Sequence, residues 1–269
     1  MIFNKKAIPF ILGKDWNNNT FTETIEVDEN LKSKQISAAK RLDSMYVAFP
    51  RPGCQHRLHI MKSLATPANM KFKVFRNTKA NDSSIACLAM SHDGSLIATA
   101  SEEGLLICLF NLEGRPLKEL RRSLLYPAHV ISMAFSLCSN YLSCSFSSQT
   151  IHIFFLDQIE SYEAIQEYRN NSYYHCLKSP VVKAGKRLTG CSLDALLCKK
   201  ADLTFKSESK NPVILAVEVD EVFKTIRLII QEGHFMPTYA YECDLRGAKD
   251  LMMIGKNLKM LTNEDYVFC

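Results

Sequence analysis

The strongest constraint on the fold is a repeat of short apolar segments in the middle of the chain. Residues 85–110 contain three apolar runs separated by turn residues, and residues 130–155 repeat this layout. Equivalent positions lie 45 residues apart: Met90-Ser91 corresponds to Phe135-Ser136, Leu96-Ile97 to Tyr141-Leu142, and Leu109-Phe110 to Phe154-Phe155. A period of about 40–45 residues is typical of β-propeller blades, which stack because one blade cannot bury both faces of its own sheet.

The rest of the chain fits this repeat less regularly. A fainter copy of the strand layout occupies residues 213–228. We predict an all-β fold, a single β-propeller domain over residues 1–269 with four-stranded antiparallel blades. Residues 1–43 would form a poorly defined blade remnant, and residues 157–200 a long loop inserted within a blade. About five blades are recognisable, and closed propellers have about four to eight, so a ring of five is one interpretation and a truncated ring of six or seven is the one we favour.

Composition narrows the class of protein. The chain has 47% hydrophobic and 23% charged residues, as ordinary globular proteins do. No apolar run approaches the roughly 18 residues of a membrane-spanning helix, and the start has no signal-peptide core. A net charge of +5 does not indicate nucleic-acid binding. The ten cysteines form no zinc-like spacing, which favours reduced thiols in the cytosol. We expect a cytoplasmic protein, at most peripheral to membranes.

Motifs for catalysis are absent from the sequence, which contains no GxSxG, HExxH, P-loop or GxGxxG pattern. His56 and His59 are three residues apart, and on a strand this spacing points the two side chains to opposite faces. We therefore expect no catalytic residue, no metal site and no cofactor, and we do not expect an enzyme.

A basic cluster follows the strand-like run LLICLF. Residues 115–122 read RPLKELRR, with four basic side chains within eight positions. Adjacent strand residues point to opposite faces, so Arg121 and Arg122 would each face a different groove between blades. Guanidinium groups suit phosphate oxygens, so two anion sites are one interpretation. The alternative is a solvated edge strand whose charges prevent aggregation.

The segment around this cluster resembles the PROPPIN family, β-propellers that bind phosphoinositides. The resemblance covers residues 44–160 well and residues 200–230 loosely. It rests on Leu120-Arg121-Arg122-Ser123, where the family has Phe/Leu-Arg-Arg-Gly, and on the following run LSCSFSSQTIHIFFL. It implies a seven-bladed propeller, which would make this chain shortened by about two N-terminal blades. It also implies recruitment to phagophore, endosomal or vacuolar membranes by phosphatidylinositol 3-phosphate or 3,5-bisphosphate, with autophagy proteins as partners.

The resemblance also implies two lipid sites, one on each side of the double arginine. The second site would comprise Arg122, Ser145, Thr150 and His152. The first would comprise Arg121, Thr99, Ser101 and Ser83. In the first site, polar residues of the family fall on Asn81, Leu105 and Cys108 here, so the second site is the stronger prediction.

The insertion at 157–200 fits the same interpretation, because the family carries a membrane-inserting loop at this place. Its first part, residues 159–168, is expected to form a short helix. Aromatic, aliphatic and basic side chains suit a bilayer interface, and they comprise Tyr173, Tyr174, Lys178, Val181, Val182, Lys183, Lys186 and Arg187. An ordinary polar loop is the alternative. For the whole chain, the alternative function is a degenerate propeller that binds only proteins.

Overall fold

The computed structural model describes residues 5–14, 20–41, 44–64, 71–79, 83–122, 126–156, 199–207, 211–220, 225–232, 238–244 and 252–256. Over these ranges the chain is β-structure with one 3₁₀ turn, η1 (Ser33–Gln35). The prediction of an all-β fold with antiparallel four-stranded sheets is confirmed. No helix among the described residues is long and apolar enough to cross a bilayer.

Four sheets follow one another along the chain, and we number them as blades. The first blade contains β3 (Ser37–Arg41), β4 (Ser44–Arg51), β5 (Cys54–Leu64) and β6 (Lys71–Lys79). The second contains β7 (Ile85–Met90), β8 (Leu96–Ser101), β9 (Leu106–Asn111) and β10 (Pro116–Arg121). The third contains β11 (Val130–Phe135), β12 (Tyr141–Phe146), β13 (Thr150–Phe155) and β15 (Leu203–Lys206). The fourth contains β16 (Pro212–Asp220), β17 (Thr225–Glu232), β18 (Thr238–Asp244) and β19 (Met252–Lys256).

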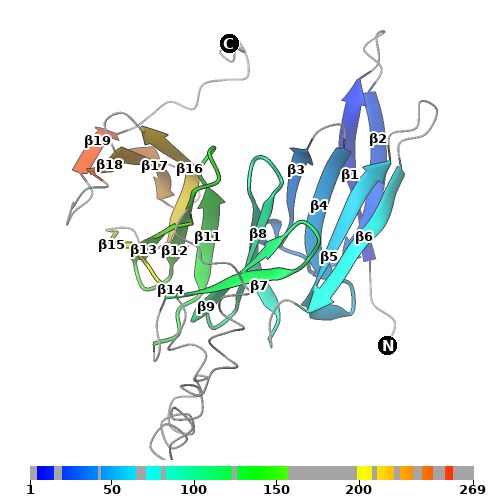
Figure 1. The fold of residues 1–269 in the computed structure, drawn as a ribbon, viewed down its shortest axis with the longest axis horizontal. Coiled ribbons are helices and arrows are strands. Elements are labelled where there is room, and N and C mark those ends of the chain that lie inside the picture. The colour runs from blue at the N-terminus through cyan, green and yellow to red at the C-terminus, as the bar shows by residue number, and fades with distance from the viewer. Residues whose placement is uncertain are drawn as a thin grey trace, which may run out of the picture.

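Two further elements complete the fold. A two-stranded antiparallel sheet, β1 (Lys5–Lys14) and β2 (Thr20–Asp28), precedes the first blade. The two-residue strand β14 (Lys199–Lys200) adds to the second blade, parallel to β10. The sheets lie side by side in chain order, from the blue β1-β2 pair to the orange and red strands of the fourth blade (Figure 1).

The 45-residue repeat is the second and third blades. Residues 85–121 form one blade and residues 130–155 the first three strands of the next, as expected. Residues 37–41, which the sequence analysis left within the 1–43 remnant, form β3, the first strand of the first blade. The hydrophobic pattern of β3 in the sequence is weak because only Ala39 of its five residues is buried.

Apolar side chains between successive blades form the core. Leu58 and Ile60 of the first blade pack with Leu88 and Ile97 of the second. The other face of the second blade packs on the third through side chains such as Leu120 and Phe146, and the third packs on the fourth. The second and third blades thus bury both faces, which is the reason such sheets occur stacked.

Turn chemistry fixes the approach of the second and third blades. Gly104 has φ +60°, and a Cβ there would lie 2.0 Å from the Ala128 carbonyl oxygen, so only glycine fits. At the opposite end of the strands, the Asp93 carboxylate accepts a hydrogen bond from Ser139 of the third blade at 2.9 Å. Both ends of this interface are therefore held by specific contacts.

The long insertion interrupts the third blade. β15 pairs with β13 as the fourth strand of this sheet, although residues 156–202 separate them in the sequence. The segment from 157 to 198 lies outside the described residues. So do the expected helix at 159–168 and the eight loop residues from Tyr173 to Arg187.

Candidate functional site

The double arginine lies at the end of β10, the last strand of the second blade. Arg121 lies opposite Leu106 of β9, and the backbone N–H of Arg122 donates to the Leu105 carbonyl at 3.0 Å. Arg121 is buried and Arg122 is half-buried. Because neighbouring residues of an extended chain point to opposite faces, the two guanidinium groups belong to different sides of the blade.

Arg122 faces the third blade. Its guanidinium carbon lies 4.9 Å from the centre of the Phe146 ring. On the same side of β12 and β13, the His152 ring meets the Phe146 ring edge-on at 5.2 Å. Phe146 therefore lies between a guanidinium group and an imidazole, and its stacking on Arg122 contributes to holding the arginine in the groove.

A continuous chain of polar contacts surrounds Phe146. Arg122 Nη2 donates to Ser148 Oγ at 3.1 Å, and Ser148 Oγ lies 2.8 Å from Thr150 Oγ1. Thr150 Oγ1 lies 3.2 Å from His152 Nε2, and His152 Nδ1 lies 3.2 Å from Thr204 Oγ1. One cation, three hydroxyl groups and one imidazole thus occupy the same side of the third blade, a donor set that suits a phosphate group.

Burial controls the charge at this groove. Burial, with a further contribution from the Arg122 cation, lowers the pKa of His152 to about 4. The imidazole is therefore neutral near pH 7, with one nitrogen as donor and the other as acceptor. Burial also lowers the pKa of Arg122, whose Nε is buried and without a hydrogen-bond partner among the described residues. Arg122 is the cation of the network that Ser148, Thr150 and His152 form.

Ser145 does not join this groove. In the β12–β13 register Ser145 lies opposite Ile151, whereas Cys144 lies opposite His152, so Ser145 faces the other side of the sheet. Its hydroxyl is fully buried, donates to the Pro212 carbonyl at 2.5 Å and lies 3.0 Å from Ser132 Oγ. Ser145 therefore connects the third blade to the fourth, which corrects the expectation that it converges with Arg122. Phe146 takes the groove side at this point of the strand.

Three of the four residues of the expected first site share the other face of the second blade. Cys108 lies opposite both Thr99 and Glu119, and Arg121 is two residues beyond Glu119, so Thr99, Ser101 and Arg121 have the same orientation. Leu88 and Cys108 on this face pack against the first blade. Thr99 is fully buried and Arg121 is 5% exposed. Ser83 is exposed and precedes β7.

Two residues of the Arg122 network were missed by the sequence analysis. Ser148 belongs to the turn between β12 and β13, and its proximity to the Thr150/His152 pair could have indicated it. Thr204 of β15 lies opposite His152 of β13. The long insertion separates the two in the sequence, and no local sequence pattern predicts their pairing.

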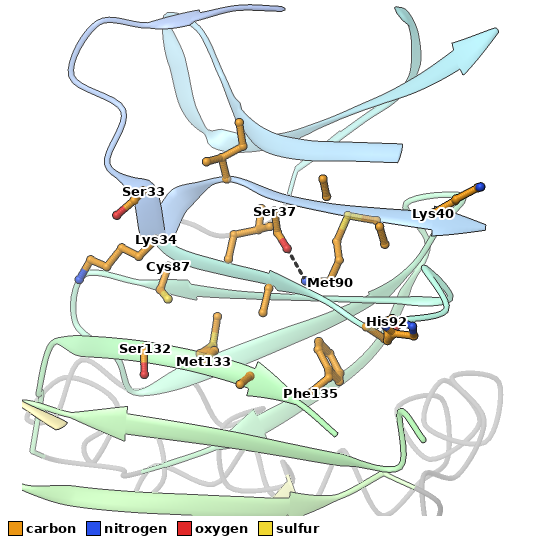
Figure 2. Close-up of a pocket in the computed structure, with 17 residues that line it drawn as sticks. Ser33, Lys34, Ser37, Lys40, Cys87, Met90, His92, Ser132, Met133 and Phe135 are labelled. Carbon is orange, nitrogen blue, oxygen red and sulfur yellow. Dashed lines mark hydrogen bonds between the residues drawn. The ribbon is translucent and has the colours of Figure 1, made fainter. Parts of the chain in front are cut away.

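A separate cavity of about 910 Å³ lies among η1, β3, β7 and β11 (Figure 2). Its lining includes Lys34, whose ammonium donates to the Val130 carbonyl at 2.6 Å, and Cys87, whose pKa burial raises to about 11. The cavity lies on the first strands of the first three blades, whereas Arg122 follows the last strand of its blade. The described residues contain no group of His, Cys, Asp or Glu side chains that could hold a metal ion.

The stacked four-stranded antiparallel sheets and the polar groove between two of them define the chain as a β-propeller protein. The family model described as PROPPIN matches residues 51–178. Autophagy-related protein 18 of Aspergillus oryzae is 32% identical over 161 residues, which cover 52% of this chain and 38% of that protein. WD repeat domain phosphoinositide-interacting protein 2 of Xenopus laevis is 43% identical over 144 residues, 53% of this chain and 31% of that protein.

Solved structures agree on the fold. Kluyveromyces lactis Hsv2 superposes with a TM-score of 0.54 at 15% identity, covering 90% of this chain and 65% of that chain. KlAtg21, solved in complex with the coiled-coil of AgAtg16, superposes with a TM-score of 0.53 at 19% identity, covering 90% and 62%. The matches thus span less than two thirds of the relatives' length. The comparisons support the resemblance inferred from the sequence: the chain is similar to the PROPPIN family over residues 51–178.

Proposed function

We propose that this chain is an autophagy-related PROPPIN that binds phosphatidylinositol 3-phosphate, phosphatidylinositol 3,5-bisphosphate or both, and acts as a peripheral membrane scaffold. The Arg122 groove is the binding site, with Ser148, Thr150 and His152 as its polar partners. The observation that carries this proposal is the continuous polar chain from the Arg122 guanidinium to His152. The name of the Xenopus relative, a phosphoinositide-interacting protein, supports the ligand class.

The arrangement suits a phosphate monoester for a physical reason. A guanidinium group binds phosphate oxygens as a fork, and hydroxyl groups can turn their protons towards an anion. The Arg122 Nε, which has no partner among the described residues, is a further donor on the same group. The groove is lined by the apolar ring of Phe146, which weakens competition from water for these donors.

In the cell, this function implies a cytoplasmic protein recruited to phagophore, endosomal or vacuolar membranes. Partner proteins of the autophagy machinery are part of the proposal, because KlAtg21 was solved with the coiled-coil of AgAtg16. The segment at 157–198, with Tyr173, Tyr174 and neighbouring basic residues, is proposed as the bilayer contact. A propeller that binds only proteins is the competing function, and it would need no lipid at Arg122.

Vesicle flotation separates the two functions. We expect the chain to float with vesicles containing phosphatidylinositol 3-phosphate and not with phosphatidylcholine vesicles. Arg122→Ala should lower the affinity about tenfold to a hundredfold, because a charge-assisted contact contributes about 1.5–3 kcal/mol. Lys32→Ala, an exposed lysine beside η1, is the matched control and should float like wild type. If Arg122→Ala floats as well as wild type, the scaffold function is correct instead.

A further inference from the structure

The cavity among η1, β3, β7 and β11, which we call the central cavity, is lined by strand edges. Each of the three strands is the first of its blade and lies at an edge of its sheet. Consecutive residues of each strand line the cavity, which the side chains of one strand face alone could not do because they alternate. Edge strands carry backbone N–H and C=O groups that no neighbouring strand pairs. The central cavity is therefore rich in main-chain donors and acceptors.

The 3₁₀ turn η1 bridges one end of the central cavity. The Lys34 ammonium donates to the Val130 carbonyl, and the Gln35 side-chain amide donates to the Ile85 carbonyl, both at 2.6 Å. Ile85 and Val130 are the first residues of β7 and β11, so η1 lies across the beginning of both strands. These contacts also show that the strand edges accept hydrogen bonds from groups outside their own sheets.

The lining of the central cavity carries positive charge and no carboxylate. It contains Lys34, Lys40 and His92, and no Asp or Glu residue. Figure 2 shows Lys34 beside Cys87 at one end, and Lys40 and His92 at the other. Burial raises the pKa of Cys87 to about 11, so its thiol is neutral at pH 7. The carboxylate of Asp93, next to His92 in the sequence, accepts hydrogen bonds from three serine hydroxyl groups instead.

Apolar side chains complete the lining. They include Met90, Met133 and Phe135, and methionine adapts its shape to different partners. Along β3, the stretch from Ser37 to Lys40 covers about 10 Å, so the two lysines are well separated. The volume of about 910 Å³ is within the range of roughly 300–1,000 Å³ for ligand sites. The central cavity thus suits an elongated molecule with separated negative groups and an apolar part.

An extended peptide meets all of these requirements. Its main chain both donates and accepts hydrogen bonds, as the exposed edge of a strand requires, and alternate side chains can enter pockets beside that edge. Acidic side chains would be attracted to the two lysines, while apolar side chains would contact the methionines. A small anion would satisfy the lysines and leave the strand edges and the apolar lining without a partner.

We propose that the central cavity is a docking site for an acidic, extended peptide segment of a partner protein. One acidic side chain binds Lys34 near η1, and another binds Lys40 at the exposed end of the cavity. This interaction surface is distinct from the Arg122 groove and does not depend on lipid binding.

Fluorescence anisotropy with a labelled ten-residue peptide of alternating glutamate and leucine tests this proposal. The same peptide with glutamine in place of glutamate should bind at least about tenfold more weakly. Lys34→Gln should weaken binding of the glutamate peptide about tenfold, and the exposed Lys40→Gln about twofold to fivefold. Lys32→Gln is the matched control, because Lys32 is an exposed lysine beside η1 that does not line the cavity. It should bind like wild type.

Three results would overturn the proposal. The first is equal binding of the two peptides to wild type, or no binding of either. The second is unchanged binding in both Lys34→Gln and Lys40→Gln. The third is displacement of the glutamate peptide by inorganic phosphate at constant ionic strength, which would show that the cavity binds small anions.

Arg122→Ala separates this site from the lipid groove. It should bind the glutamate peptide like wild type, and a loss as large as in Lys34→Gln would show that the peptide occupies the Arg122 groove. Lys34→Gln should in turn float with phosphatidylinositol 3-phosphate vesicles like wild type. Failure of wild type to float would therefore contradict only the proposed function, and failure of the peptide to bind would contradict only the present inference.

Discussion

The two grooves beside the double arginine are built from adjacent residues and yet differ in character. Arg121 is 5% exposed, and its face carries the buried Thr99 and the apolar contacts with the first blade. Arg122 is half-buried and stacks on Phe146. It is also the first member of a chain of polar contacts that continues through hydroxyl groups to an imidazole. The comparison shows that alternation along a strand decides which groove an arginine faces. The neighbouring blade decides whether that arginine serves packing or binding.

Arg121→Ala is expected to have the largest effect on stability, and its result can contradict the difference between the two grooves. A buried side chain is removed from the interface of the first two blades, so the free energy of unfolding should fall by about 2–4 kcal/mol. Affinity for phosphoinositide vesicles should fall less than in Arg122→Ala. Urea denaturation followed by tryptophan and tyrosine fluorescence measures the first quantity, and flotation measures the second.

Arg122→Ala is the matched variant for stability. It removes the same side chain one residue further along, and it should cost less in unfolding free energy because Arg122 is only half-buried. If Arg121→Ala unfolds like wild type and loses lipid binding as fully as Arg122→Ala, the first groove is also a ligand site and the two grooves are alike.

The free energy of unfolding should depend on pH through His152, which lies in the binding groove. Its pKa of about 4 in the folded protein lies below the ordinary histidine value of 6.5. Between these values the unfolded chain binds a proton that the folded protein does not, so stability falls as pH drops from about 6.5 to 4. Above pH 6.5 the contribution is present in full. The loss should be on the order of 1–3 kcal/mol for this buried group.

Denaturation of wild type and His152→Gln at pH 7.5, 5.5 and 4.5 measures this contribution. The variant should lose less stability than wild type over the same interval. His129→Gln is the control, because His129 is exposed on the linker between the second and third blades. A pH dependence in His152→Gln as steep as in wild type would show that other groups cause it.

Much of the fold could be predicted from the sequence. The repeat at residues 85–110 and 130–155 predicted the second and third blades correctly. The side chains of its strands alternate between two buried interfaces, and short turns join the strands. β3 could not be predicted with the first blade, because SAAKR has one buried side chain and gains its structure from pairing with β4. The place of β15 also escaped, since its partner β13 lies before a long insertion.

The candidate site was predictable in part for the same reasons. Arg122, Thr150 and His152 were found because strand spacing and the family resemblance both indicate them. Ser145 was placed in the wrong groove because a shift of one residue along a strand reverses the face, and only the register of β12 on β13 reveals it. The place of Thr204 depends on strand pairing across the insertion, which no local pattern contains.

The last prediction uses two serines, three residues apart, to separate packing from binding. Ser145→Ala leaves the Pro212 carbonyl without its buried donor, and should lower the free energy of unfolding by about 1–2 kcal/mol while vesicle binding is retained. Ser148→Ala removes an exposed hydroxyl that links Arg122 to Thr150, so stability should change by less than about 0.5 kcal/mol. Its affinity for phosphoinositide vesicles should fall by about twofold to tenfold, the loss of one hydrogen bond. Denaturation and flotation on the same two proteins give the four values. If Ser145→Ala weakens vesicle binding and Ser148→Ala does not, the binding face is the one that meets the fourth blade.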